Sequence, residues 1–472
     1  MKAVIAGGGT VGSQLAAQLI REGLDVVLIE QNAERARVLA NRLDCLVVTG
    51  GCNNLEILNK ASIAEADFFI AVTTSDEINM IACGLVSSEF NVGLKIARVR
   101  TFDYSSTAIS GKSFLGIDRV VNPELEASRE IVRSVDLGAI SDVVEFRNSP
   151  LQMRSLTIVP GSTLAGLSLH EANDRFDVTF LVGVIVRKRR YLIPDGNTVI
   201  EEGDQLFAVA TDEAFRILFD KLGKNRRPIE KVVIVGGGKV GRLVLQHLMR
   251  HDHPGGGRDA GARVRSVFRS NRRRIQVVEQ DYEKCKALSA QFPDILVTNA
   301  DISDESVFQE EHFSDADLLI STTENQELNM VTALFARSLG VKRSVVLVNN
   351  SSYVNVCGQL EIDVAVSLKN SVVDTIVSTI RHGTGEVINT VRSISDGSVE
   401  VLELNVGEGS RVVGRPLSDV RMPKDSLIMS VSRDGTTFVP TGDSILQPGD
   451  SVVAIARHDQ FDKLELAFKA QK

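Results

Sequence analysis

Two glycine-rich segments carry the residues whose types and spacing are suited to chemistry. The first is Gly7-Gly8-Gly9-Thr10-Val11-Gly12, and Gly236-Gly237-Gly238-Lys239-Val240-Gly241 repeats it in the second half of the chain. Each segment follows a short apolar run and opens a stretch with helical apolar spacing, which is the setting of a dinucleotide fingerprint. The first glycine allows a tight turn, the second lets a pyrophosphate approach the backbone, and the third packs helix on strand. Both segments therefore predict a phosphate site.

An acidic residue ends the predicted strand that follows each glycine segment. Glu30 and Glu279 occupy this place. A carboxylate there accepts hydrogen bonds from the ribose hydroxyls of adenosine and repels a 2′-phosphate, so NAD is favoured over NADP. The alternative is that the glycines only pack a tight turn. This alternative carries more weight in the second copy, because an insertion separates Gly241 from Glu279.

Paired threonines follow a later apolar run in each copy. Thr73 and Thr74 stand at the carboxyl end of the predicted fourth strand, and the repeat aligns Thr322 and Thr323 with them. Hydroxyls and backbone at that strand end face the ligand crevice of an open parallel sheet. The alternative is a helix cap, since Ser75 is also a good capping residue.

Two arginines end the predicted fifth strand of the first copy. Arg98 and Arg100 are one residue apart, so they point the same way and could make charge-assisted contacts to an anion; a plain surface pair is the alternative. The second copy has Leu347 and Asn349 at the aligned positions, although Lys239 adds a cation within its glycine segment. We therefore expect the two sites to be non-equivalent.

The sequence offers no catalytic set. A dehydrogenase needs an acid, base or nucleophile beside the nicotinamide. The smaller units, at about 150–225 and 395–470, contain only His170 and His458 as histidines and no cysteine. The five cysteines form no CxxC pair and are expected to be reduced thiols. His251-Asp252-His253 lacks a third metal ligand nearby. We predict neither an enzyme nor a metal site.

Alternating strands and helices must position the glycine segments. Short β-rich runs lie at 3–6, 26–29, 46–48, 68–72, 96–99 and 120–121, with helical patterns between them, and Asn32 is placed to cap one helix. This alternation predicts right-handed βαβ units and a parallel sheet. The smaller unit that follows has strand patterns separated by glycine turns, which indicates a small α+β module.

The repeat sets the expected domain organisation. The length of 472 residues alone predicts about three domains. Repetition of both units instead predicts an α/β fold with two Rossmann-like parallel-sheet domains at 1–148 and 228–385, each followed by a small α+β domain, at 149–227 and 386–472. A polar, basic segment at 221–228 is the expected linker.

Composition excludes several classes of function. The net charge of −8, the aromatic content of 5% and the absence of Trp argue against nucleic-acid binding. No apolar run approaches the ~20 residues that span a bilayer. Two basic clusters stand out, an insertion at 251–274 and the run 187–190. The insertion is either a solvated loop or a contact for anionic lipid headgroups or an acidic partner, and the run 187–190 lies where a hairpin would turn.

The combined pattern resembles the RCK/KTN family, the regulators of potassium conductance and potassium-transport nucleotide-binding domains. The residues that carry the resemblance are the glycine segment, Glu30, Thr73-Thr74 with Asp76-Glu77 and Asn79, Pro194-x-Gly196, and Glu202-Gly203-Asp204. The resemblance implies that the larger domains bind NAD(H) and also ATP or ADP. It implies a first site lined by Gly7 to Val11, Glu30, Thr73, Thr74 and Arg98, and a second lined by Gly236 to Val240, Glu279, Thr322 and Thr323.

The same resemblance implies a cellular role. Such proteins form homo-oligomeric rings on the cytoplasmic face of the bacterial inner membrane and gate an integral-membrane potassium transporter subunit. One departure concerns the Gly-Asp that family members often carry after the third strand, near the adenine. Gly50-Gly51 stands there in the first copy, and Asn299-Ala300 followed by Asp301 in the second. The rival classes are an NAD-dependent oxidoreductase or epimerase and a scaffold with vestigial sites.

Overall fold

The computed structural model divides into two compact units, each built from both halves of the chain. It describes residues 1–101, 115–136, 143–146, 149–176, 178, 180–188, 190–222, 229–252, 273–360, 362–383, 388–394 and 399–469. The first unit combines Met1–Ile140 with Pro228–Ile380, and the second combines Ser141–Arg227 with Arg381–Lys472. Residues 223–228 of the predicted linker, residues 253–272 of the basic insertion, and Arg189 lie outside the described residues. The predicted domain boundaries stay a prediction.

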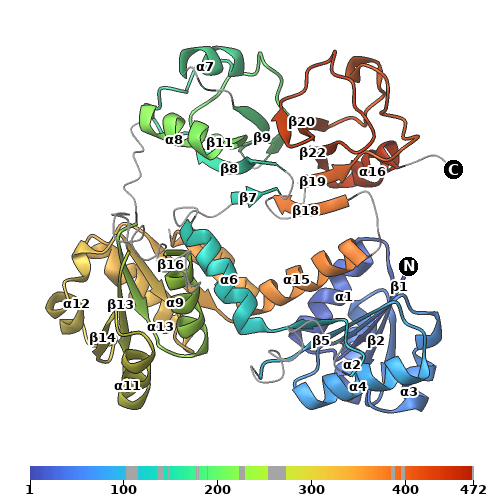
Figure 1. Ribbon diagram of the computed structural model, residues 1–472, viewed down its shortest axis with the longest axis vertical. Coiled ribbons are helices and arrows are strands. Elements are labelled where there is room, and N and C mark those ends of the chain that lie inside the picture. Colours follow the sequence, from blue (N-terminus) through green and yellow to red (C-terminus); the bar gives the residue numbers. More distant parts are fainter. Residues whose placement is uncertain are drawn as a thin grey trace, which may run out of the picture. The chain divides into compact units, whose positions relative to one another are not determined.

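Among the described residues, the first unit contains two six-stranded parallel sheets with the same topology (Figure 1). The first sheet has the order β3-β2-β1-β4-β5-β6, with β1 (Lys2–Ala6), β2 (Asp25–Glu30), β3 (Leu46–Thr49), β4 (Phe68–Ala71), β5 (Leu94–Arg98) and β6 (Arg119–Val121). The second has the order β14-β13-β12-β15-β16-β17, with β12 (Lys231–Val235), β13 (Arg274–Glu279), β14 (Leu296–Asn299), β15 (Leu318–Ser321), β16 (Ser344–Val348) and β17 (Val364–Ser367). These sheets confirm the predicted pair of Rossmann-like domains.

Helices connect the strands of both sheets. The first domain has α1 (Thr10–Arg21), α2 (Ala33–Arg42), α3 (Leu55–Lys60) and α4 (Asp76–Glu89). The second has α9 (Lys239–Asp252), α11 (Tyr282–Gln291), α12 (Ser306–Glu310), α13 (Gln326–Ser338) and α14 (Ser351–Gln359). As expected, the side chain of Asn32 caps α2 by accepting a hydrogen bond from the Arg35 N–H at 2.9 Å.

The strand order creates one crevice in each sheet. In the first sheet β1 pairs with β2 on one side and β4 on the other, and β12 lies between β13 and β15 in the second. The chain therefore winds in opposite directions on the two sides of the central strand. Ligands of open α/β sheets bind outside the carboxyl ends of the strands at such a switch point. Both glycine segments lie there, directly after β1 and β12.

Two helices are exchanged between the sheet domains. Helix α6 (Pro123–Asp136) follows β6 of the first sheet, but its apolar residues, among them Ile131 and Val135, pack in one cluster with the second sheet and α9. Helix α15 (Leu368–Gly383) follows β17 of the second sheet, and its apolar face, including Ile376, packs with β1 and α1 of the first. Each sheet is therefore covered on one face by a helix from the other half.

The second unit contains two antiparallel sheets from the small modules. The first module has the order β10-β9-β11-β8-β7, with β7 (Val143–Glu145), β8 (Leu151–Thr157), β9 (Leu181–Arg187), β10 (Arg190–Leu192) and β11 (Gln205–Thr211), and helices α7 (Leu169–Phe176) and α8 (Asp212–Lys221). The second has the order β18-β19-β22-β20-β21, with β18 (Ile388–Ile394), β19 (Val399–Asn405), β20 (Ser426–Arg433), β21 (Thr436–Phe438) and β22 (Ser451–Arg457), and helix α16 (Phe461–Phe468). One apolar cluster takes side chains from both sheets, among them Met153, Phe207, Val401 and Met429. The modules are therefore packed on each other and confirm the α+β prediction.

A buried ion pair recurs in both small modules. Arg187 donates two hydrogen bonds to the fully buried Asp204, at 2.8 and 2.7 Å. Arg433 makes the same pair with Asp450 at 2.7 Å. Each carboxylate also accepts the N–H of the residue three positions earlier, which closes the Gly-Asp turn. Arg187, one member of the basic run 187–190, is thus committed to an internal contact.

Candidate nucleotide-binding sites

The first glycine loop is shaped by close backbone packing. Gly7 has a φ of +107° and donates its N–H to the carbonyl of Ile29 at 2.8 Å. A Cβ on Gly7 would lie 2.9 Å from the Thr73 nitrogen, and one on Gly12 would lie 1.8 Å from the Gly7 carbonyl oxygen. The turn and the approach of α1 to the loop therefore require glycine at both positions, as the fingerprint predicts.

Gly9 differs from its neighbours because the protein itself gives no reason for a glycine there. A Cβ on Gly9 would meet nothing within 4 Å, and the φ of Gly9 is −68°. Gly9 precedes α1, which has no side-chain cap and no acidic residue in its first turn. The first N–H groups of a helix have no partner within the helix and carry partial positive charge. Open space beside such donors fits a pyrophosphate held close to the backbone.

Glu30 is placed to fix the loop and to accept further hydrogen bonds. Its carboxylate is only 6% exposed and accepts the N–H of Gly8 at 2.9 Å and of Asn32 at 2.7 Å. The Arg35 guanidinium lies 3.8 Å from the same carboxylate. Since each carboxylate oxygen has two lone pairs, acceptor capacity remains for ribose hydroxyls.

The second site repeats this geometry closely. Gly236 has a φ of +95° and donates to the Val278 carbonyl at 2.9 Å. The Glu279 carboxylate, 7% exposed, accepts the N–H of Gly237 at 2.7 Å and of Asp281 at 3.0 Å. A Cβ on Gly238 would again meet nothing within 4 Å. Two loops in one chain thus offer the same donors and the same carboxylate.

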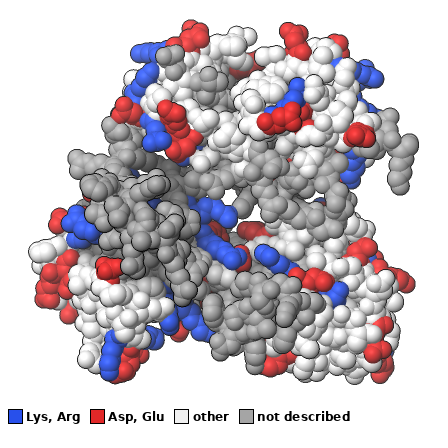
Figure 2. Space-filling model, in the orientation of Figure 1, with Lys and Arg blue, Asp and Glu red and all other residues white. Residues whose placement is uncertain are grey.

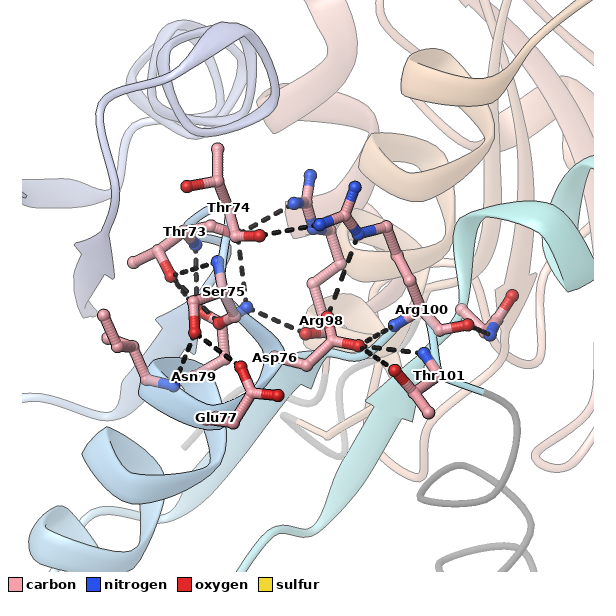
Figure 3. A network of polar contacts seen from close by, with 11 residues as sticks. Thr73, Thr74, Ser75, Asp76, Glu77, Asn79, Arg98, Arg100 and Thr101 are labelled. Carbon is pink, nitrogen blue, oxygen red and sulfur yellow. Dashed lines mark hydrogen bonds and ion pairs between the residues drawn. The ribbon is translucent and has the colours of Figure 1, made fainter. Parts of the chain in front are cut away.

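The Thr73–Thr74 loop is held to its own helix and to β5 by a buried asparagine (Figure 3). Asn79 is fully buried; its side-chain oxygen accepts the Thr73 N–H at 2.9 Å and its nitrogen donates to the Arg98 carbonyl at 2.8 Å. Ser75 is the residue that caps α4, through the Ile78 N–H. Ser75 therefore caps the helix instead of Thr73 or Thr74, and the Thr74 side chain is exposed.

The two arginines both reach the carbonyls of this loop, as Figure 3 shows. Arg98 donates to the Thr73 carbonyl at 2.8 Å, and Arg100 donates to the Thr74 carbonyl at 2.7 Å. The Nε of Arg98 is buried and has no hydrogen-bond partner among the described residues. Burial lowers the pKa of the Arg98 guanidinium, and the charge of Arg100 adds to this effect. Arg98 therefore lies beside the crevice with donor capacity left.

Asp76 ties this loop to the strand that follows. Its buried carboxylate accepts the N–H groups of Arg100 and Thr101, at 2.9 and 2.8 Å, and the Thr101 hydroxyl. Burial raises the pKa of this carboxyl, but the three hydrogen bonds and the Arg100 charge outweigh it and lower the pKa overall. From the sequence, Asp76 is only a helix-cap candidate beside Ser75, and Ser75 is the residue that caps α4.

The structure corrects the alignment of the threonines in the second copy. Thr323 makes the hydrogen bonds of Thr73, since its N–H binds the side-chain oxygen of Asn329 at 2.9 Å. Thr322 instead takes the place of Val72, and its hydroxyl is buried against the carbonyls of Val235 and Gly236. The counterpart of Thr74 is therefore Glu324. One extra residue before β15 had hidden this register in the sequence.

A second correction concerns the residue after the third strand. Gly50 and Ala300 are equivalent, because their N–H groups bind the carbonyls of Glu30 and Glu279 respectively. Asp301 therefore matches Gly51, so the second copy does carry an acid where the family often does. The Asp301 carboxylate accepts the N–H and hydroxyl of Ser303, which lower its pKa.

Other chemistry finds no support in the part of the chain that the structure describes. The five cysteines are unpaired, and burial raises the pKa of Cys52 to about 11, so its thiol is protonated at neutral pH. The described residues contain no group of His, Cys, Asp and Glu suited to hold a metal ion. No helix among them has both the length and the apolar character needed to cross a membrane.

Comparison with known families decides the relationship. Residues 3–123 and 232–368 match the TrkA-N domain, and residues 153–223 and 401–469 match the TrkA-C domain. The chain belongs to the TrkA family. The "Trk system potassium uptake protein TrkA" of Halomonas elongata is 30% identical over 458 residues, which cover 96% of this chain and 95% of that protein. TrkA of Azorhizobium caulinodans is 29% identical over 473 residues, with 99% of both chains covered.

Solved structures show the same fold. The RCK domain of GsuK aligns with a TM-score of 0.54 at 18% identity, covering 99% of this chain and 95% of that chain. The GsuK channel bound to NAD aligns with a TM-score of 0.55 at 18% identity, covering 99% and 79%. The predicted family and RCK fold are thereby confirmed. These TrkA relatives are named potassium uptake proteins rather than enzymes, which supports the prediction that the chain is not an enzyme.

Proposed function

We propose that the chain is a nucleotide-sensing regulatory subunit of a Trk-type potassium uptake system. It binds NAD(H), and ATP or ADP, at the two glycine loops and gates a membrane-embedded potassium transporter by conformational change. Family membership supports the potassium uptake role. The observation that carries nucleotide binding is the open space at Gly9 and Gly238, each beside the start of a helix without acidic residues in its first turn and beside a buried carboxylate.

The chain's own groups would divide the binding work. The N–H groups at the start of α1 hold the pyrophosphate, and Glu30 accepts the ribose hydroxyls. The Thr73–Thr74 loop, held by Asn79, lies on the far side of the crevice. A bound nucleotide supplies the anionic and hydroxyl groups that these residues contact. Binding shifts the protein between conformations only as far as its affinities for them differ.

The proposal includes a place and a partner. The subunit acts as a homo-oligomeric ring on the cytoplasmic side of the inner membrane, bound peripherally to an integral-membrane transporter. On the face in Figure 2, acidic and basic side chains are interspersed over the described surface.

Thermal unfolding with NAD, NADH, ATP and ADP tests the proposal. A ligand that binds only the folded state at one hundred times its Kd adds about 2.7 kcal/mol per site. The wild-type melting temperature should therefore rise by several degrees with at least one nucleotide. The double variant Gly9→Ala/Gly238→Ala should melt normally without ligand and show no rise. If no nucleotide shifts the wild type, the sensing proposal is wrong.

A further inference from the structure

The two candidate sites differ most at one position beside the glycine loop. Thr74 occupies it in the first site and Glu324 in the second, and both side chains are exposed. The correspondence rests on the same hydrogen bond in both sites: the residue that precedes each donates its N–H to the side-chain oxygen of a fully buried asparagine, Asn79 or Asn329. A carboxylate thus replaces a hydroxyl at a structurally fixed point.

The backbone holds Glu324 next to the second glycine loop. Asn329 accepts the Thr323 N–H and hydroxyl, at 2.9 and 2.6 Å, and donates to the Thr323 carbonyl at 3.0 Å. A Cβ on Gly236 would lie 2.9 Å from the Thr323 nitrogen, so this loop touches the glycine loop. Glu324 is the next residue and is exposed, so it lies beside the glycine loop that would hold the pyrophosphate.

The surroundings of this position also differ in charge. In the first site Arg98 and Arg100 bind the loop carbonyls. In the second site Leu347 and Asn349 take their places, and the Asn349 side chain reaches the Glu324 carbonyl at 3.5 Å without adding charge. Lys239 opens α9, so its charge favours the pyrophosphate that every candidate nucleotide shares.

We propose that Glu324 sets the ligand class of the second site, which takes a dinucleotide such as NAD(H) and rejects ADP and ATP. This inference rests on the proposed function and deepens it. A terminal phosphate carries about −1.5 to −2 charge at neutral pH, and the Glu324 carboxylate beside it would repel it. The distal half of a dinucleotide has no terminal phosphate, and its ribose hydroxyls can donate to Glu324. The first site, with Thr74 and two guanidinium groups, admits terminal phosphates.

Calorimetric titration of the full chain isolates the second site. In the Gly9→Ala background only the second site remains, and NAD should bind there at least about tenfold more tightly than ATP. Glu324→Thr, which installs the first-site residue, should restore ATP binding by roughly the same factor. Glu324→Gln should do so as well, because it removes the charge and keeps the shape. The matched control Glu310→Gln removes a carboxylate from exposed α12 and should leave the preference unchanged.

The reciprocal change tests the first site. In the Gly238→Ala background, Thr74→Glu should weaken ATP binding about tenfold and leave NAD binding within a factor of about two. High salt should shrink this difference, since screening acts on exposed charges.

The outcomes separate this inference from the proposed function. If the wild-type chain binds no nucleotide, the proposed function fails. The inference is wrong, and the proposed function stands, if the Gly9→Ala chain binds ATP as tightly as NAD. The same holds if Glu324→Thr and Glu324→Gln leave the ratio of the NAD and ATP affinities unchanged. Failure of the Gly9→Ala chain to bind either ligand also overturns the inference.

Discussion

The glycines of each loop are glycines for different physical reasons. Gly7 has a positive φ, and Gly12 lies against the Gly7 carbonyl, so both are needed by the fold. Gly9 has a negative φ and no close neighbour, so we attribute the glycine at this position to the approach of a ligand. The fingerprint in the sequence names all three, but only the structure separates the glycine that serves binding from those that serve packing.

Alanine substitution should make this separation measurable. Gly12→Ala should destabilise the first domain by about 2 kcal/mol or more, because the added Cβ clashes with backbone. Gly9→Ala should change the free energy of unfolding by less than about 0.5 kcal/mol and abolish nucleotide binding at the first site. Chemical denaturation and ligand titration of both variants provide the check. Equal stability losses in the two variants would contradict the assignment.

Asp76 should give the first site a pH dependence. Its hydrogen bonds hold its pKa below the usual value near ~3.9, so the stability it contributes is present above that pH and is lost as the pH falls through the lowered pKa. Asp76→Asn should therefore lower stability by about 1 kcal/mol at pH 7. Urea unfolding should show that the difference in unfolding free energy between the wild type and Asp76→Asn is smaller at pH 3.5 than at pH 7. A difference that is larger at pH 3.5 would refute this role.

Some residue contacts could not be predicted from the sequence. The sequence places Arg98 and Arg100 correctly at a strand end, but their hydrogen bonds to loop carbonyls depend on how two strands and a loop meet. The register of Thr323 and Glu324 could not be predicted either, because the sequence does not show at which point of the short repeat the extra residue is inserted. The hydrogen bond that the Thr323 N–H donates to the buried Asn329 side chain fixes this register.

At the scale of elements, the sequence predicts helices between the strands, but not which sheet each helix packs on. Local periodicity reports that a helix has an apolar face, and it carries no information on which sheet that face meets. Helix α6 lies between the first sheet and the small module in the chain, yet it packs on the second sheet, and α15 packs on the first. The parallel sheets were predictable because strand and helix alternate along the chain.

The helix exchange predicts a long-range effect of mutation. Ile376 on α15 is fully buried against the first sheet. Ile376→Ala should cost about 2–4 kcal/mol, as other large-to-small core changes do. Hydrogen exchange should show protection lost in β1 and α1, although the mutated residue belongs to the second half. Loss confined to the second sheet would contradict the exchange.

The family motif of the small module has an element-scale explanation. Asp204 is fully buried, accepts two hydrogen bonds from Arg187, and raises the pKa of that guanidinium. A Gly-Asp turn is therefore fixed to the β9 strand by an ion pair. Gly449-Asp450 repeats this turn in the second small module, where Arg433 makes the same ion pair.

For the whole molecule, the duplication predicted from the sequence has a consequence that the sequence does not display. Each compact unit takes parts from both halves of the chain, so neither half contains a complete unit. The glycine-loop helices α1 and α9 each pack against a helix from the other half. Two candidate nucleotide sites therefore lie in one packed unit, which suits a protein that senses ligands and responds as one body.

Potassium flux through the co-reconstituted membrane subunit tests the central claim most directly. The account predicts that at least one of NADH, NAD, ATP and ADP changes the flux when the wild-type chain is present. It also predicts that the Gly9→Ala/Gly238→Ala chain still binds the membrane subunit but no longer responds to any of the four. Flux that is the same with and without every nucleotide, with wild-type chain bound to the transporter, would contradict the account.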